Sequence, residues 1–159
     1  MVLEYREILK EELEKYRELM LPMIYEELTE QEDMESEYFC IAAEFDNEPA
    51  GVIIAEPEGS GDINLLSIWV AQEYRGLGIA TELRKKLLDV ALRLYDWEES
   101  QYGDDVTLKV MYCLSGKYRE SFEAWLRAND FTDFFITRPA GDNTPDVCGA
   151  SSEIHFYRT

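Results

Sequence analysis

The sequence contains few residues of the kinds that build metal centres and disulfide frameworks. Its 159 residues include one histidine, His155, and three cysteines, Cys40, Cys113 and Cys148. The cysteines are far apart, no pair has the spacing of zinc ligands, and an odd number does not indicate a disulfide framework. A site that needs two histidines is excluded, and we expect neither a bound metal nor a structural disulfide.

Long hydrophobic runs are also missing. No apolar stretch approaches the roughly 20 residues that a helix needs to cross a bilayer. The first residues, M-V-L-E-Y-R-E-I, are charged from the fourth position and lack the pattern of a signal peptide. We therefore expect a cytoplasmic protein that does not bind membranes.

Basic residues are scarce relative to acidic ones. The chain has 15 lysines and arginines against 34 aspartates and glutamates, which gives a formal net charge of -19. Nucleic acids and anionic membranes both favour clustered Lys and Arg, so neither is an expected partner. The charge suits a cationic substrate such as an amine, although an acidic surface that keeps the protein in solution explains it more simply.

The remaining composition is that of a folded domain. Apolar residues make up 46% of the chain and charged residues 31%, which is typical of globular proteins. A chain of this length is large enough to bury a hydrophobic core. We predict one domain over residues 1–159, without an internal repeat or a linker.

The spacing of apolar residues predicts strands and helices in a mixed order. Leu13, Tyr16, Met20 and Met23 recur at helical spacing, and Pro22 is tolerated in a helix only in its first turn, so two short helices are predicted within Lys10–Glu35, meeting near Leu21–Pro22. The predicted strands are Val2–Leu9, Tyr38–Phe45, Ala50–Glu56, Asp62–Val70, Val106–Tyr112, Phe131–Arg138 and Glu153–Arg158. The later helices are Gly76–Trp97 and about Tyr118–Ala128, and Pro139–Ala150 is predicted to be a loop. This order indicates an α/β or α+β protein with one layer of sheet and helices packed on it.

One stretch, Leu65–Leu83, has the features of an anion-binding element. A strand-like apolar run ends at Val70, a polar turn with Gly76 and Gly78 follows, and a helical apolar pattern starts at Ile79. The first N–H groups of a helix have no internal partner and lie at the positive end of the helix dipole. Glycine lets the backbone approach a phosphate closely or adopt a positive φ. We predict that this loop holds a pyrophosphate.

Two well-known phosphate loops do not fit this stretch. A Walker loop needs Lys and Ser or Thr after its second glycine, whereas Ile79 and Ala80 follow Gly78. A dinucleotide-binding loop has a third glycine and opens a βαβ unit, whereas here Thr81 stands at the third position and a predicted hairpin precedes the loop. Neither alternative therefore matches the residues of this stretch and the elements around it.

A third loop does fit. Arg75-Gly76-Leu77-Gly78-Ile79-Ala80 resembles R/Q-x-x-G-x-G/A, the acetyl-coenzyme A loop of the GNAT N-acetyltransferase superfamily. The order of the predicted elements, including the last short helix followed by Asp130–Phe131, is also similar to a GNAT domain over essentially the whole chain. The resemblance implies a central, mostly antiparallel sheet of about seven strands with helices on both faces.

The resemblance also implies roles for residues around the loop. In GNAT proteins the strand before the loop pairs with the pantetheine arm of coenzyme A through backbone groups, and the loop amides bind the pyrophosphate. The residues that take these positions here are Ile68, Trp69, Val70, Arg75, Gly76, Leu77, Gly78, Ile79, Ala80 and Thr81, the last through its hydroxyl. Acetyl-CoA is the implied cosubstrate, and no metal is implied.

The resemblance also indicates candidate catalytic residues. Acetyl transfer needs a neutral amine and an acid for the departing thiolate. The position of the family's usual glutamate base falls near Asp62, with Asn64 on the same strand face to orient the reactants. The family's usual acid is a tyrosine in the last helix, but that position is Leu126. Of the nearby tyrosines Tyr112, Tyr118 and Tyr157, Tyr118 is our candidate acid, although packing in the core explains any single tyrosine better.

The acceptor cleft of such folds is lined by the early helices and by a loop between the last strands. These are Met23–Glu37 and Pro139–Ala150, which contain Tyr25, Glu26, Glu27, Asp142, Asp146 and Cys148. An acidic lining suits a cationic amine, but the same side chains would also be satisfied facing water.

The sequence therefore predicts an N-acetyltransferase that passes the acetyl group of acetyl-CoA directly to the amine of a small molecule or a peptide. The alternative is a GNAT-like domain that binds acyl-CoA as a sensor or interaction module with little catalysis, which the leucine at position 126 supports. A homodimer is compatible with the sequence.

Overall fold

The computed structural model describes residues 2–30, 38–57, 62–97, 105–113, 119–137 and 147–155. The chain divides into two compact units, residues 1–57 with 65–101 and residues 58–64 with 102–159. Strand β4 (Asp62–Val70) is shared, because its first three residues belong to the second unit and the others to the first. The prediction of one domain over residues 1–159 stays a prediction.

The fold is mixed α/β, as predicted. The strands described by the structure form a seven-stranded sheet in the order β1-β2-β3-β4-β5-β7-β6. The pairs β1–β2, β2–β3, β5–β7 and β6–β7 are antiparallel, so the sheet is mostly antiparallel. The elements of the first unit are β1 (Leu3–Glu7), η1 (Lys10–Leu19), α1 (Pro22–Glu30), β2 (Phe39–Phe45), β3 (Glu48–Pro57), most of β4, η3 (Gln72–Tyr74) and α2 (Ile79–Trp97). Those of the second are β5 (Asp105–Cys113), α3 (Arg119–Ala128), β6 (Asp133–Thr137) and β7 (Val147–His155).

The predicted hairpin is confirmed as β2–β3. Asp46 and Asn47 form its two-residue turn with φ values of 47° and 71°, a left-handed conformation that Asp and Asn tolerate better than most residues. The side chain of Asp46 also accepts a hydrogen bond from the Val2 N–H at 2.8 Å. The turn therefore fixes the hairpin and ties the start of β1 to it.

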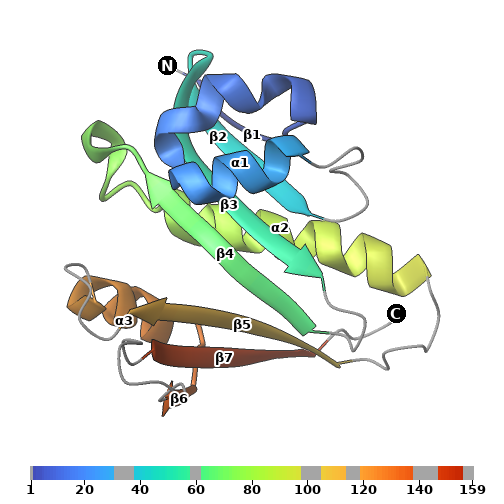
Figure 1. The fold of residues 1–159 in the computed structure, drawn as a ribbon, viewed down its shortest axis with the longest axis vertical. Coiled ribbons are helices and arrows are strands. Elements are labelled where there is room, and N and C mark those ends of the chain that lie inside the picture. The colour runs from blue at the N-terminus through green and yellow to red at the C-terminus, as the bar shows by residue number, and fades with distance from the viewer. Residues whose placement is uncertain are drawn as a thin grey trace. The chain divides into compact units, whose positions relative to one another are not determined.

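Strands β2 and β3 of the first unit bury both of their faces. Figure 1 shows η1 and α1 over one face of β2 and β3, and α2 across the other. The apolar cluster on the η1 side consists of Ile8, Leu13, Tyr16, Leu19, Met20, Leu28, Tyr38, Cys40, Ala42, Val52 and Ile54. Side chains alternate along a strand, so Ile41 and Ile53 point the opposite way, and both are at most 2% exposed. On α2, the buried residues Ile79, Leu83, Leu87 and Ala91 recur at helical spacing.

The two predicted short helices are also confirmed. The 3₁₀ helix η1 ends at Leu19 and α1 begins at Pro22, which occupies the first helical position where its missing N–H costs nothing. Met23 does not join the apolar face, since its side chain is 74% exposed. Because Pro22 begins a new helix, Met23 does not continue the apolar stripe of Leu13 and Tyr16 on η1.

A buried carboxylate anchors η1 to the sheet. The Glu44 side chain on β2 is 6% exposed and accepts hydrogen bonds from Arg6 Nε at 2.7 Å, from Lys15 Nζ at 2.9 Å and from the buried Tyr16 hydroxyl. Arg6 also donates to the Tyr16 hydroxyl at 3.0 Å and pairs with Glu12. We call Arg6, Lys15, Tyr16 and Glu44 the Glu44 cluster. Burial by itself raises the pKa of Glu44, but these hydrogen bonds outweigh it and lower that pKa to about 2.

The last strand starts earlier than predicted. Residues 147–150 were expected in a loop, but β7 begins at Val147 and runs to His155. Cys148 lies opposite Tyr112 of β5 and opposite Ile136 of β6, so β7 is hydrogen-bonded on both sides. Pairing with two neighbours outweighs the weak strand preference of this Gly- and Ala-containing segment. The predicted end of the strand at Arg158 lies outside the described residues.

Candidate active site

The loop that follows β4 is held against the β2–β3 hairpin. The N–H of Ala71, directly after β4, donates to the Ala50 carbonyl at 2.8 Å, and the N–H of Tyr74 donates to the Ala71 carbonyl at 2.9 Å. The Tyr74 ring then stacks on Phe45 with a centroid distance of 4.9 Å. These contacts fix where the loop starts, so the glycines after it have a defined position.

Gly76 and Gly78 both adopt the left-handed conformation, with φ values of 85° and 79°. A Cβ added to either would meet no protein atom within 4 Å, so the need for glycine comes from the backbone and not from crowding. The helix therefore begins at Ile79 and not at Gly76 as predicted, because neither glycine is in a helical conformation.

The first turn of α2 presents free backbone donors at this loop. The first helical hydrogen bond runs from the Glu82 N–H to the Gly78 carbonyl at 3.1 Å, so the N–H groups of Ile79, Ala80 and Thr81 have no partner within the helix. They lie at the positive end of the helix dipole. This arrangement suits an anion, as the sequence predicted.

Gly51 on β3 is a site residue that the sequence prediction missed. A Cβ added there would lie 3.2 Å from Ile79 Cγ2, 3.2 Å from Leu83 Cδ1 and 3.2 Å from the Trp69 carbonyl oxygen. Glycine thus lets the first turn of α2 and the end of β4 approach the same point of β3. A lone glycine inside an apolar strand pattern is a known sign of close approach and could have revealed this role.

We expect Gly51→Ala to destabilise the protein by about 1 kcal/mol, because the added methyl group overpacks a tight contact. Urea unfolding at neutral pH measures the change. Glu48→Ala, at an exposed position of the same strand, is the control and should have little effect. An unfolding free energy equal to that of the parent in Gly51→Ala would contradict the close approach.

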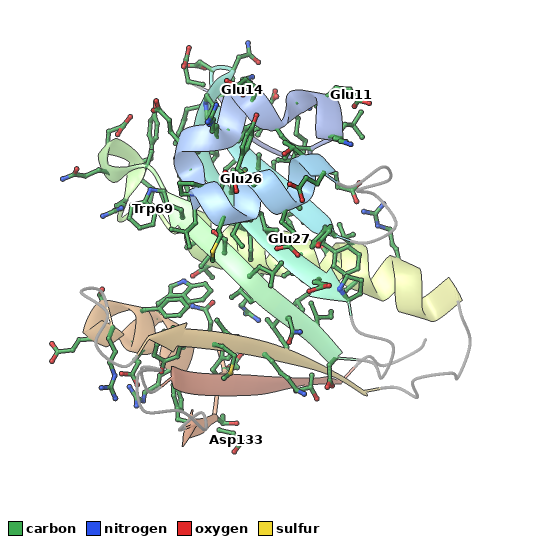
Figure 2. All side chains as sticks on the ribbon, viewed as in Figure 1. Glu11, Glu14, Glu26, Glu27, Trp69 and Asp133 are labelled. Carbon is green, nitrogen blue, oxygen red and sulfur yellow. The ribbon has the colours of Figure 1, made fainter. Side chains whose placement is uncertain are left out.

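The Arg75 side chain folds back onto the end of β4. Its Nε donates to the Val70 carbonyl at 3.0 Å, and its guanidinium lies over the Trp69 ring, 4.6 Å from the centroid. Figure 2 labels Trp69 beside the loop, and this indole is 38% exposed. Arg75 is therefore engaged with the strand that precedes the loop.

Asp62 and Asn64 occupy one face of the first part of β4, while Ile63 and Leu65 between and after them are buried. The Asp62 carboxylate forms an ion pair with Lys109 of β5 at 2.5 Å, and its side chain is 22% exposed. The candidate base is thus a half-buried carboxylate with a cationic partner.

A family model described as the acetyltransferase (GNAT) family matches residues 3–99 of the chain, which is more than half of it. The chain belongs to the GNAT acetyltransferase family. Acetyl transfer from acetyl-CoA is therefore the general class of its activity. The matched residues include β1 to α2 and the whole Gly76–Gly78 loop.

Solved structures of GNAT proteins share the fold over nearly the full chain. A protein from Desulfovibrio desulfuricans assigned to the GNAT family is 15% identical, with a TM-score of 0.73 and coverage of 96% of this chain and 99% of the other. The ribosomal-protein-S18-alanine N-acetyltransferase from Escherichia coli is 13% identical, with a TM-score of 0.65 and coverage of 99% and 97%. A Bacillus subtilis acetyltransferase in complex with CoA is 16% identical, with a TM-score of 0.58 and coverage of 96% and 97%. At these identities the likeness shows the fold. No curated protein sequence matches the chain.

Helix α3 lacks the tyrosine that the GNAT pattern places there. Leu126 at that position is fully buried. Asp130 directly after α3 takes a φ of 69°, a left-handed conformation that Asp tolerates better than most residues. Trp125 beside Leu126 stacks on Phe122 at 6.0 Å, and its Nε1 is buried without a hydrogen-bond partner in the part of the chain that the structure describes.

Of the three candidate acids, Tyr112 lies within the described residues. Tyr118 and Tyr157 lie outside the described residues. Tyr112 on β5 is half-buried, and its ring meets Phe122 edge-on at 5.3 Å. Its hydroxyl donates to Glu123, whose pKa is lowered because hydrogen bonds from Arg119 and Tyr112 outweigh the effect of burial.

The residues predicted to line the acceptor cleft are partly engaged with their own chain. The Tyr25 hydroxyl donates to Glu14 at 2.5 Å, and the Tyr38 hydroxyl donates to Glu27 at 2.8 Å. Glu26 on α1 is exposed (Figure 2). Asp142 and Asp146 lie outside the described residues, and Cys148 lies in β7 and not in a loop.

Among the described residues, none of the helices could span a membrane. Within the same residues, no group of three or more His, Cys, Asp and Glu side chains is arranged to hold a metal ion.

Proposed function

We propose that this chain is a cytoplasmic N-acetyltransferase, in which both units together form one GNAT domain. It transfers the acetyl group of acetyl-CoA directly to the amine of a small molecule or a peptide. The observation that carries the proposal is the pair of left-handed glycines, Gly76 and Gly78, placed directly before the free amides of α2.

In this proposal the loop holds the pyrophosphate through backbone groups. The N–H groups of residues 76–80 donate to phosphate oxygens, and the Thr81 hydroxyl adds a further donor. The N–H of Arg75, which was predicted to join them, is already donated to the Gln72 carbonyl at 3.3 Å. Backbone groups of Ile68, Trp69 and Val70 pair with the pantetheine arm. Because the donors belong to the backbone, the site does not depend on local positive side chains, which suits a chain with a net charge of -19.

The chemical step requires an amine without its proton, since only the neutral form has a lone pair to attack the thioester. As the amine nitrogen bonds to the carbonyl carbon, the carbon–sulfur bond breaks and the thiolate leaves. Asp62 takes the proton from the amine, directly or through water, and Asn64 orients the reactants. Tyr118 remains the candidate donor of a proton to the thiolate.

Asp62→Asn should lower kcat about 100-fold, because the amide keeps the shape of the carboxylate but cannot accept the proton. Steady-state rates with saturating acetyl-CoA measure the effect. Asp133→Asn, an exposed carboxylate on β6, is the control. A parental kcat in Asp62→Asn would remove Asp62 as the base.

The activity itself is tested by free thiol release from acetyl-CoA in the presence of small amines, polyamines, aminoglycosides and peptides. We expect release that depends on the amine, together with an acetylated product detected by mass spectrometry. Calorimetry with CoA on the same protein measures binding separately. Absence of both binding and turnover over a broad panel would reject the proposal.

A second function, an acyl-CoA-binding module with little catalysis, is favoured by two observations. The tyrosine position of the GNAT pattern is a buried leucine, Leu126, and the candidate base Asp62 is paired with Lys109. Tight CoA binding without turnover on any amine would support this alternative. Turnover with a single amine would exclude it. The mass of the protein in solution, measured in the same preparations, decides between a monomer and a homodimer.

A further inference from the structure

We propose that Arg75 is a positioning residue that fixes the end of β4, and that its charge is not a ligand of the phosphate. The inference rests on the proposed coenzyme A function of the loop. It concerns the arginine of the loop motif, whose cationic side chain is the obvious candidate for a direct phosphate contact.

Two independent contacts hold the Arg75 side chain on the strand. The Nε proton is donated to the Val70 carbonyl at 3.0 Å. The guanidinium also contacts the Trp69 ring. It lies 4.6 Å from the ring centre, within the range of a cation–π contact. We call Trp69, Val70 and Arg75 the β4 clamp.

The β4 clamp lies where β4 ends and the glycine loop begins. Val70 is the last residue of β4, and Ala71 after it is tied to Ala50 of β3. Without Arg75, the Val70 carbonyl would lose the hydrogen bond from Nε, and the Trp69 ring would lose its contact with the guanidinium. The clamp thereby sets the direction in which the chain leaves β4, and with it the position of Gly76 and Gly78.

The anion does not need the charge of Arg75. The loop already offers the N–H groups of Ile79, Ala80 and Thr81 and the positive end of the α2 dipole. A side chain that orders these donors before the ligand arrives reduces the ordering cost of binding. Arg75 thus contributes to affinity by preorganisation.

Lysine cannot perform this role. It has the charge of arginine and binds phosphate as a point charge, but it lacks the Nε donor and the planar face that stacks on an aromatic ring. Arg75→Lys therefore distinguishes a phosphate ligand from a positioning residue. CoA affinity would stay near the parental value if Arg75 bound the phosphate, and would fall if Arg75 acts through the β4 clamp.

The test is a double-mutant cycle of Arg75→Met and Trp69→Ala, with Arg75→Lys added and Lys86→Met on α2 as the control for loss of one positive charge. Hydrogen exchange of residues 65–83 is measured without ligand, and CoA affinity is measured by calorimetry. We expect faster exchange and about tenfold weaker CoA binding in Arg75→Met, Arg75→Lys and Trp69→Ala. The double variant should bind CoA no more weakly than Arg75→Met alone, because the guanidinium–indole contact that Trp69→Ala removes is already absent in Arg75→Met. The control should match the parent.

Three results would overturn the inference: unchanged exchange in Arg75→Met, parental CoA affinity in Arg75→Lys, or additive losses in the double variant. The hydrogen-exchange cycle needs no ligand. If the parent did not bind CoA, the proposed function would fail, and the exchange data would still decide whether the clamp exists. Thermal unfolding of every variant identifies any that has lost its fold, in which case Trp69→Leu, which keeps an apolar side chain but has no aromatic face, replaces Trp69→Ala in the cycle.

Discussion

Gly78→Val should weaken coenzyme A binding by at least about 100-fold while the protein stays folded. Gly78 adopts a φ of 79°, which a β-branched residue avoids because its Cβ and γ carbons collide with the neighbouring backbone. The loop would have to rearrange to relieve this strain, and the N–H groups before and within the first turn of α2 would no longer point to one place. Because a Cβ at this position meets no protein atom within 4 Å, the core is not disturbed.

Calorimetry with CoA and thermal unfolding of the same samples separate these two effects. Leu77→Ala is the matched control, since this exposed side chain lies between the two glycines and its removal leaves the backbone donors in place. We expect Leu77→Ala to bind CoA nearly as the parent does. Equal affinity of Gly78→Val and the parent would show that the loop does not hold the cofactor.

Glu44→Ala should reduce the free energy of unfolding by about 3 kcal/mol, the lower end of the range for breaking a buried ion pair. The truncation leaves the fully buried Tyr16 hydroxyl without its acceptor and leaves Arg6 and Lys15 without their shared carboxylate. The loss is not larger because the Arg6 and Lys15 side chains are about 40% exposed and can be hydrated. Urea unfolding at pH 7 measures it. Glu48→Ala, an exposed glutamate on the same hairpin, should cost much less.

The same carboxylate predicts a dependence of stability on pH. The pKa of Glu44 is lowered to about 2 in the folded protein from its ordinary value of 4.5, so the folded state binds this proton less readily than the unfolded state. The stabilisation is therefore present in full above pH 4.5 and is lost as the pH falls toward 2. Glu44→Gln has no such proton, so the stability difference between parent and Glu44→Gln should shrink between pH 5 and pH 3. A constant difference would contradict the lowered pKa.

Local patterns in the sequence predicted most of the elements, because their causes are local. Pro22 marks the start of α1 and Asp46–Asn47 makes the turn of the β2–β3 hairpin, since both act through the conformation of their own backbone. The strand–glycine–helix pattern of residues 65–83 likewise predicted a loop before α2, and the structure differs only in starting the helix at Ile79. The predicted extent of β7 was wrong, because residues 147–150 are ordered by pairing with β5 and β6 and not by their own preferences.

Contacts between distant residues could not be predicted in the same way. Glu44 is one of many glutamates in an acidic chain, and only the fold shows that it is buried and bonded to Arg6, Lys15 and Tyr16. Gly51 looks like an ordinary strand residue until Ile79 and the Trp69 carbonyl are placed beside it. Each of these contacts joins segments that are about 20 or more residues apart in the chain, so no pattern of neighbouring residues records it.

The fold class and the position of the glycine loop could be predicted from local features, because strand and helix periodicity and the conformational freedom of Gly76 and Gly78 are properties of the local chain. The contacts of the side chains around that loop depend on the folded chain. Folding turned Arg75 onto Trp69 and Val70, paired Asp62 with Lys109 and buried Leu126 in α3. The direction of a side chain depends on the partners that folding brings to it, and the backbone pattern of a loop does not specify those partners.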